Sequence, residues 1–213
     1  MPLKPVQRVN IPPVKQGAYL GICTRIIDLG EQRFQDKGLF KPRVSLMFEL
    51  CGHSVDRGNG EEPRAISFDC NLITYKKADK ASEYRKMIES WLDSELSDEE
   101  AVDFQLRSML GEPAELLIAK EMVNGEYRNK ITSFSPVELD RDVPEPRMEL
   151  IILELPSPDD ADKDRLLAEA LETMKKLPEW QQERIKKSNT WAQLNAGAAR
   201  VAMPTTAADD APF

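Results

Sequence analysis

AELLIAKEMVNGEYRNKITSFSPV, residues 114–137, is the stretch that decides the fold. Its two halves, residues 114–122 and 126–137, are rich in apolar and β-branched residues, and an Asn-Gly pair at residues 124–125 lies between them. Asn-Gly between two such runs is a strong hairpin signal, because both residues adopt the positive φ that the tightest hairpin turns require. We therefore predict two antiparallel strands joined by a short turn.

The segment before this hairpin has a helical period. In residues 77–92, KADKASEYRKMIESWL, apolar side chains recur three and four positions apart, which predicts an amphipathic helix. A second, shorter helix is expected in residues 97–103, SDEEAVD, where Ser97 as N-cap and Glu100 three positions later form a capping box. A helical insert therefore precedes the hairpin.

Three strands are expected before that insert. Residues 18–30, AYLGICTRIIDLG, are rich in β-branched residues and end on a glycine, while residues 43–50 and 65–75 alternate apolar and polar side chains. Three strands, a helix and a hairpin follow one another in the order of an OB-fold, a small five-stranded Greek-key barrel. We predict a mainly β protein with α-helices, in which an OB-fold barrel has its helical insert between strands 3 and 4. Other five-stranded barrels fit the same order.

The region after the hairpin is expected to be helical and then disordered. Residues 148–155 indicate a further short strand. Helical spacing predicts one helix over residues 162–177, and Pro178 in a first helical position opens another through Lys187. From Asn195 onward, Ala, Gly, Thr and Pro without an apolar period indicate a disordered tail. The expected domains are an OB-fold domain over residues 1–155, a helical extension over residues 156–191 and a flexible acidic tail over residues 192–213.

The composition excludes several classes of function. The 213-residue chain is 41% hydrophobic and 31% charged, and no apolar run approaches the roughly 20 residues that a bilayer requires. Its first residues lack a signal-peptide pattern, so we expect a cytoplasmic protein without a membrane partner. Cys23, Cys51 and Cys70 lie far apart in apolar surroundings and are expected to be reduced. With His53 as the only histidine, in an expected loop, and no nucleotide-binding glycine loop, we expect no catalytic residue, no metal and no cofactor.

The charge is unevenly distributed along the chain. The net charge is −8, but residues 1–48 hold eight basic and three acidic side chains, a local charge of +5. Binding to the phosphate groups of a nucleic acid requires cations at the surface that the nucleic acid contacts. A basic surface on an acidic chain is therefore compatible with nucleic acid as a partner.

Aromatic and basic residues are interleaved in three of the expected connections. Exposed rings stack on unpaired bases while cations follow the phosphates, so this composition favours single-stranded DNA. The predicted DNA-binding residues are Arg25, Arg33, Phe34, Lys37, Phe40, Lys41, Arg43, Tyr75, Lys76, Lys77, Tyr127, Arg128 and Lys130. The alternative is that Phe34 or Phe40 plugs the end of the barrel beside solvated lysines. The rings expected to pack in the core are Phe48, Phe68, Trp91 and Phe134.

The chain ends in AADDAPF, residues 207–213. A terminal ring with its own carboxylate suits an apolar pocket beside a cation, the proline reduces the entropy lost on docking, and two acids suit a basic rim. The predicted partner-binding residues are Asp209, Asp210, Pro212 and Phe213. The alternative is an acidic end without a partner.

These segments resemble a known family. The tip DDAPF resembles the one with which bacterial single-stranded DNA-binding proteins recruit replication and repair enzymes, although the long Gly/Gln/Pro linker of those proteins is absent. The body is similar to bacteriophage single-stranded DNA-binding proteins of OB-fold type, through IIDLG, VSLMFEL, residues 66–91, residues 104–137 and LPEWQQERIKKS, over most of residues 17–191. The resemblance implies a non-enzymatic protein that coats single strands without sequence preference during phage DNA replication, recombination and repair, in the host bacterial cytoplasm.

Two other functions stay open at this point. An OB domain that binds protein instead of DNA would be an adaptor that docks onto a host replication enzyme. A strand-annealing recombination mediator would also bind single strands. The sequence leaves open whether several copies associate on DNA, and it predicts no role for the helix over residues 178–188.

Overall fold

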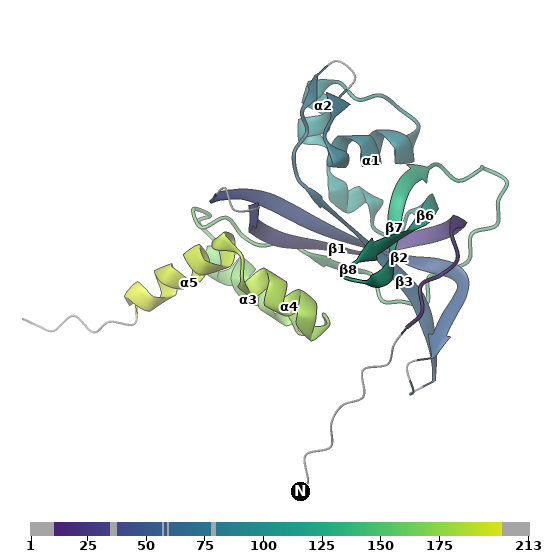
Figure 1. Ribbon diagram of the computed structural model, residues 1–213. Helices are drawn as coiled ribbons and strands as arrows, with labels where there is room; N and C mark the ends of the chain where they lie inside the picture. Colours follow the sequence, from purple (N-terminus) through teal and green to yellow (C-terminus); the bar gives the residue numbers. More distant parts are fainter. Residues whose placement is uncertain (1–10, 35–37, 57, 59, 78–79, 202–213) are drawn as a thin grey trace, which may run out of the picture. The chain divides into compact units, whose positions relative to one another are not determined.

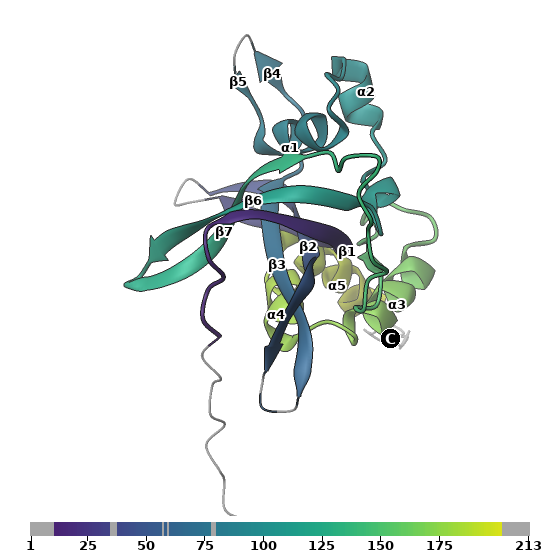
Figure 2. The same cartoon turned by 90° about the vertical axis from the view of Figure 1, so that its right-hand side faces the viewer.

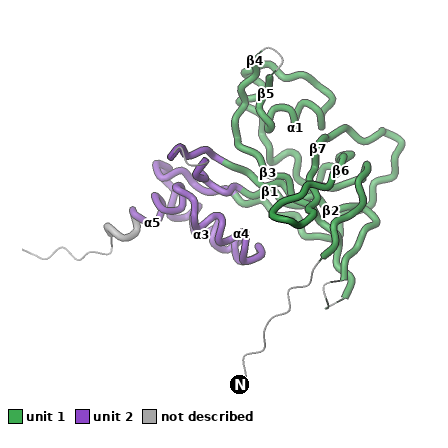
Figure 3. Tube along the Cα trace, in the orientation of Figure 1, with its two compact units in different colours: residues 1–27, 43–153 green, residues 28–42, 154–213 purple. Residues whose placement is uncertain are grey.

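The computed structural model forms two compact units (Figure 3). Unit 1 comprises residues 1–27 and 43–153, and unit 2 comprises residues 28–42 and 154–213. The structure describes residues 11–34, 38–56, 58, 60–77 and 80–201, and only the backbone of residues 197–201. Unit 2 thus joins the C-terminal region to a segment that lies within the predicted OB-fold domain. The predicted division into three domains stays a prediction.

Unit 1 is built on one sheet (Figure 1). The strands of this sheet are β1 (Gly17–Phe34), β2 (Leu39–Asp56), β3 (Glu61–Asn71), β6 (Pro113–Val123), β7 (Glu126–Ser135) and β8 (Ile151–Leu153). Their order is β3-β2-β1-β6-β7, with antiparallel β2–β3, β1–β6 and β6–β7 pairs, and β8 pairs with β1 in parallel. The predicted mainly β fold with an antiparallel sheet is confirmed.

Barrel closure and a count of five strands are not confirmed. In the described part of the chain, β3 and β7 are the two edges of the sheet and no ladder joins them. β8 is an additional strand, while β4 (Lys76–Lys77) and β5 (Lys80–Ala81) form a separate ribbon. The two edges approach each other through side chains, since the ring centroids of Phe68 on β3 and Phe134 on β7 are 4.9 Å apart.

β2 and β3 pair with each other, and the alternating apolar side chains of both strands bury one face of this pair. The buried register pairs are Val44 with Cys70, Leu46 with Phe68, and Phe48 with Ile66. The opposite face of β2 is covered as well, because Met47 and Glu49 are also buried. The Glu49 carboxylate accepts hydrogen bonds from the N–H groups of Arg147 (3.0 Å) and Met148 (2.7 Å), which holds the segment before β8 against this face.

The core of unit 1 contains five buried aromatic rings, those of Phe48, Phe68, Tyr84, Trp91 and Phe134. Phe48 is fully buried, and its ring centroid lies 5.3 Å from that of Trp91 and 5.6 Å from that of Phe134. The Trp91 indole N–H donates to the carbonyl oxygen of Pro113 over 2.7 Å, so the polar group of this buried ring is satisfied. The prediction that Phe48, Phe68, Trp91 and Phe134 pack in the core is confirmed.

The helical insert follows β3 and precedes β6 (Figure 2). Its elements are α1 (Glu83–Leu92), α2 (Asp98–Asp103) and a 3-10 turn, η2 (Leu106–Met109). α1 contacts both β3 and β7, and it begins later than predicted because residues 76–77 and 80–81 form the β4–β5 ribbon before its N-cap, Ser82. The capping box of α2 is confirmed, since the Ser97 hydroxyl accepts from the Glu100 N–H (3.1 Å) and the Glu100 carboxylate accepts from the Ser97 N–H (2.8 Å).

In its described residues, unit 2 consists of helices α3 to α5 and the end of the β1–β2 hairpin (Figure 3). The helices are α3 (Lys163–Met174), α4 (Glu179–Lys186) and α5 (Asn189–Val201). Its buried apolar side chains in the described residues are Leu29, Ala170, Met174, Leu177, Ile185 and Leu194. The two helices predicted over residues 162–177 and 178–187 are confirmed, and aliphatic side chains rather than aromatic rings form this core.

The predicted disorder of the tail is wrong as far as Val201, because α5 extends to that residue. The segment 195–201 is rich in alanine, the best helix former, and a helix can therefore continue through it without an apolar period. Residues 202–213, with the predicted docking tip at Asp209, Asp210, Pro212 and Phe213, lie outside the described residues.

A glycine lets β1 approach the junction of α4 and α5 closely. Gly30 is buried with a φ of +66°, and a Cβ added there would lie 2.7 Å from the Ser188 Oγ and 3.0 Å from the Thr190 Cβ. The next residue, Glu31, donates its N–H to the Thr190 hydroxyl over 2.9 Å. Only glycine fits this position without displacing the helices.

The histidine and the cysteines lie in or beside strands. His53, which was expected in a loop, is part of β2, and its ring centroid lies 5.1 Å from that of Tyr19. Cys23, Cys51 and Cys70 are free thiols as predicted, and burial raises the pKa of Cys23 and Cys70 to about 12. Among the described residues, no helix combines the length and the apolar character needed to cross a bilayer.

Candidate nucleic-acid interface

The β6–β7 hairpin extends beyond the rest of the sheet (Figure 2). One of its faces continues a buried face of the sheet into solvent. Ile118 stands opposite Ile131, and both are buried. Because side chains alternate along a strand, the same face carries Asn129 and then, at the far end, the register pair Met122 and Tyr127. Met122 is 60% exposed and Tyr127 is 59% exposed. The hairpin therefore presents an apolar and aromatic face that no part of unit 1 covers in the described residues.

Arg128 and Lys130 lie on the opposite face of this hairpin. Arg128 Nη2 is 3.9 Å from a Glu126 carboxylate oxygen, and Lys130 Nζ is 3.5 Å from Glu121 Oε1. All four side chains are more than half exposed, so these ion pairs contribute little to stability and exchange readily with other anions. The structure thus divides the predicted cluster Tyr127, Arg128 and Lys130 between a ring face and a charged face.

Two hollows lie along the seam between the edge strands β3 and β7. The smaller, about 260 Å³, is bordered by residues 64–67 and 127–129, and the larger, about 620 Å³, is bordered by Phe68, residues 130–134 and α1. The basic residues on the borders of these two hollows are Arg64, Lys86, Arg128 and Lys130, and the acidic residue there is Glu83.

The N-terminal segment crosses the smaller hollow. The Asn129 amide donates to the Val14 carbonyl oxygen (3.1 Å) and accepts from the Val14 N–H (2.8 Å), and Arg64 Nη2 donates to the Pro12 carbonyl oxygen (2.9 Å). Ile11 lines the same hollow. The segment is therefore attached to both edge strands of the sheet.

The second predicted cluster, Tyr75, Lys76 and Lys77, leads into the β4–β5 ribbon. Tyr75 is 58% exposed and Lys77 is exposed. Lys76 is instead engaged in unit 1, with its Nζ 3.4 Å from Glu89 Oε1 and 3.7 Å from Glu95 Oε2. The structure therefore leaves one ring and one cation of this cluster at the surface.

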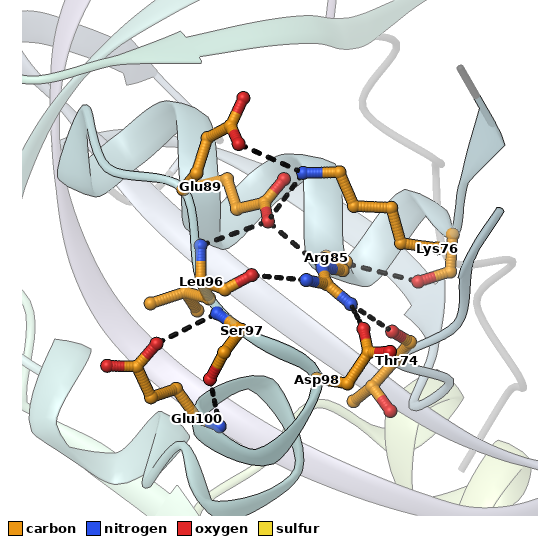
Figure 4. Close-up of polar contacts among 10 residues, drawn as sticks. Thr74, Lys76, Arg85, Glu89, Leu96, Ser97, Asp98 and Glu100 are labelled. Carbon is orange, nitrogen blue, oxygen red and sulfur yellow. Dashed lines mark hydrogen bonds and ion pairs between the residues drawn. The ribbon is translucent and has the colours of Figure 1, made fainter. Parts of the chain in front are cut away.

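A buried arginine organises this region (Figure 4). The Arg85 guanidinium donates to the Thr74 carbonyl oxygen (3.2 Å), to the Leu96 carbonyl oxygen and to the carboxylates of Glu89 (2.9 Å) and Asp98. Burial acts to raise the pKa of Glu89, but hydrogen bonds from Arg85, the Leu96 N–H and Lys76 outweigh it and lower the pKa. Glu89 therefore stays ionised, and the path of the chain before Tyr75 is fixed by the network.

The first predicted cluster belongs to unit 2, at the end of the β1–β2 hairpin. Lys41 Nζ lies 4.0 Å from the centroid of the Phe34 ring, which is half-buried. Arg33 is exposed and Phe40 is 46% exposed, so neither Phe34 nor Phe40 is buried in a core. Lys37 lies outside the described residues.

Arg25 and Arg43 differ from the other predicted contacts because they are half-buried in strands of unit 1. The Nε atom of each is buried and has no hydrogen-bond partner in the described residues. Burial lowers the pKa of Arg25, and the Glu149 carboxylate acts in the opposite direction. Both arginines are therefore less accessible to a ligand than Tyr127, which is mostly exposed.

The predicted contacts thus divide between the units. Unit 1 brings Tyr127, Arg128 and Lys130 to the seam, and unit 2 brings Arg33, Phe34, Phe40 and Lys41 to one hairpin end. The sequence analysis missed Arg64 and Lys86, although Arg64 has the strand parity of Ile66 and Phe68 and its position on the inner face follows from that alternation. Lys86 precedes the buried Met87 in a helix, so only the packing of α1 against β7 could reveal its place.

The comparisons with known proteins identify no relative. No protein-family model matches the chain, and no curated protein matches it. Within the described residues, no group of three His, Cys, Asp or Glu side chains is placed to hold a metal ion. The resemblance to phage single-stranded DNA-binding proteins therefore stays a prediction.

Proposed function

We propose that the sheet of unit 1 is an OB-fold barrel and that the protein binds single-stranded DNA without sequence preference and without catalysis. The strand order β6-β1-β2-β3 is that of a Greek key, in which the fourth strand returns beside the first. α1 lies in sequence between the third and fourth of these strands, and the Phe68–Phe134 contact joins the edges that closure of an OB barrel would pair.

The observation that carries the binding proposal is the exposed register pair Met122 and Tyr127 at the end of the buried sheet face. A phenol ring that is 59% exposed costs free energy in water and offers a stacking surface to an unpaired base. Arg64, Lys86 and Lys130 border the two hollows between β3 and β7, where their positive charges can contact the phosphates of a bound strand. Binding of single-stranded DNA requires aromatic rings for the bases and cations for the phosphates, and unit 1 presents both.

The wider role in phage DNA replication, recombination and repair rests on the resemblance of the sequence. In this proposal the protein coats single strands in the cytoplasm of a bacterial host. Its tip, with Asp209, Asp210, Pro212 and Phe213, recruits replication or recombination enzymes. Coating requires no reaction, so no catalytic residue is assigned.

The test is a titration of fluorescently labelled oligo(dT) with the full chain, read by anisotropy at two salt concentrations. We expect binding that weakens with salt, because cations displace counterions from the phosphates. Tyr127→Leu should weaken binding by about 1–3 kcal/mol, the usual contribution of one stacked base, whereas Tyr127→Phe keeps the ring and should bind like the wild type. Lys130→Gln should weaken binding and reduce the salt slope by about 0.7.

The matched control for charge is Arg165→Gln, an exposed arginine of α3 between two acids. It should leave binding unchanged. Absence of binding to oligo(dT) at low salt contradicts the proposal and favours the adaptor, which binds protein instead of DNA. Acceleration of the pairing of complementary strands in an annealing assay would assign the protein to the recombination mediators.

A further inference from the structure

Helix α4 presents a ring and two cations along one stripe. Trp180, Arg184 and Lys187 follow one another at spacings of four and three residues, which places them on one side of the helix. Trp180 is 47% exposed, although large rings of this kind are usually covered. The neighbouring stripe faces inward, because Gln181 and Ile185 are both fully buried. The orientation of α4 is therefore fixed by its buried side, and the exposed tryptophan is a consequence of that orientation.

The hairpin end of unit 2 contacts the C-terminal part of this helix. Gly30 lies against Ser188, and the side-chain amide of Gln32 donates to the Arg184 carbonyl oxygen over 3.0 Å and to the Leu29 carbonyl oxygen over 2.6 Å. β1 and α4 therefore adjoin, and Phe34 is the last residue of β1.

Each ring in this part of unit 2 is accompanied by a cation. Lys41 Nζ lies 4.0 Å from the Phe34 centroid, and Arg184 Cζ lies 5.9 Å from the Trp180 centroid. A cation beside an exposed ring is held where it can also reach the phosphate of a base stacked on that ring. The hairpin end adds Arg33 to these pairs. Two ring-and-cation pairs on adjoining elements have the chemistry of a surface for unpaired nucleotides.

We propose that α4 and the β1–β2 hairpin end form a second contact surface for single-stranded DNA, located within unit 2, with Trp180 and Phe34 as stacking rings. This inference rests on the proposed function, since it assigns a further part of the chain to the same ligand. It gives a role to the helix over residues 178–188. Two surfaces on one chain raise the affinity for a strand that reaches both, because the second contact becomes intramolecular.

Intrinsic tryptophan fluorescence tests the proposal. The chain has three tryptophans, of which Trp91 is buried, Trp191 is half-buried and Trp180 is exposed. Addition of oligo(dT) should quench the emission, and Trp180→Phe should remove most of that quenching, while the anisotropy of labelled oligo(dT) checks that the variant still binds. Trp191→Phe is the matched control and should keep the quenching.

Affinity gives the second readout. Trp180→Leu should weaken binding about fivefold or more, which is the lower end of the contribution of one stacked base. Arg184→Gln should reduce the salt slope by about 0.7, and Arg165→Gln should not. The far-ultraviolet circular dichroism and the urea midpoint should match the wild type, because the buried stripe of Gln181 and Ile185 is unchanged.

The outcomes separate this inference from the proposed function. If the wild type binds oligo(dT) and Tyr127→Leu weakens binding while Trp180→Leu does not, the second surface is rejected and the proposed function stands. If the wild type does not bind at all, both fail. Quenching that survives in Trp180→Phe and disappears in Trp191→Phe would also overturn the assignment of Trp180.

Discussion

The cores of the two units contain different kinds of side chain, although unit 1 also carries exposed rings at Tyr75 and Tyr127. In unit 1, Phe48, Phe68, Trp91 and Phe134 pack against one another in the core, with centroid distances of 4.9 to 6.0 Å. In unit 2 the core is aliphatic, and Phe40 and Trp180 are nearly half exposed. The type of residue therefore does not decide its use. An aromatic ring that is not packed in a core stays exposed and can contact a binding partner.

The two hairpins show the same difference in their backbones. The β6–β7 turn uses Asn124 and Gly125 with positive φ, and open space surrounds the glycine. The end of β1 in the other hairpin passes the buried Gly30, where the space is filled by Ser188 and Thr190. Gly125 permits the tight turn, and Gly30 permits the close packing.

The largest effect is expected where the aromatic core of unit 1 is opened. Phe48→Ala removes a fully buried ring that contacts Trp91 and Phe134, and the free energy of unfolding should fall by about 3–5 kcal/mol. Urea denaturation followed by tryptophan fluorescence measures this. Phe40→Ala, at an exposed ring of unit 2, is the matched control and should stay within about 0.5 kcal/mol of the wild type. Equal losses in the two variants would remove the distinction between buried and available rings.

A smaller effect should separate two glycines that share the same φ of +66°. Gly30→Ala combines left-handed backbone strain of about 1–2 kcal/mol with overpacking against Ser188 of about 1–3 kcal/mol. Gly38→Ala has nothing within 4 Å of the added Cβ and should lose only the strain term. The difference between the two urea midpoints isolates the packing of β1 on the helices. Similar midpoints would show that this close approach does not occur in solution.

The smallest effect concerns a carboxylate of unit 2. Burial raises the pKa of Asp28, against hydrogen bonds that its oxygens accept from the N–H groups of Gly30 (2.7 Å) and Leu155 (3.3 Å), and nearby Glu154 raises it further. A raised native pKa means that the folded state binds the proton more tightly than the unfolded state, where the pKa is about 3.9. The stability of the wild type relative to Asp28→Asn should therefore fall as the pH rises from about 3.9 through the raised pKa. Urea midpoints at pH 4 and pH 7 measure it, and a constant difference between the two proteins would contradict the assignment.

Much of the fold follows from local pattern. The Asn-Gly turn, the Ser97 capping box and the core positions of Phe48 and Trp91 were all predictable, because each depends on residues close in the chain or on simple alternation. The short strand predicted within residues 148–155 is present as β8, whereas the β4–β5 ribbon and the extension of α5 were not predicted. Each strand of that ribbon is only two residues long and depends on its partner strand.

The candidate site was predictable in part. The exposure of Tyr75 agrees with its place in a connection, and that of Tyr127 with its place beside the hairpin turn. The separation of Tyr127 from Arg128 by strand parity could have been deduced from the alternation of side chains along a strand. The engagement of Lys76 with Glu89 could not, since those residues meet only when α1 packs beside the ribbon. Trp180 was overlooked although its spacing from Arg184 is visible in the helical pattern.

By itself, the sequence determined the periodicity of strands and helices, the position of the hairpin turn and the presence of rings beside cations. Those properties depend on neighbouring residues and on the pitch of the backbone. The tertiary structure alone decided which rings are buried and which remain exposed, and which cations are held by carboxylates. Exposure and ion pairing are set by contacts between segments far apart in the chain, as when Gln32 meets Arg184 or Phe68 meets Phe134, and no local pattern contains that information.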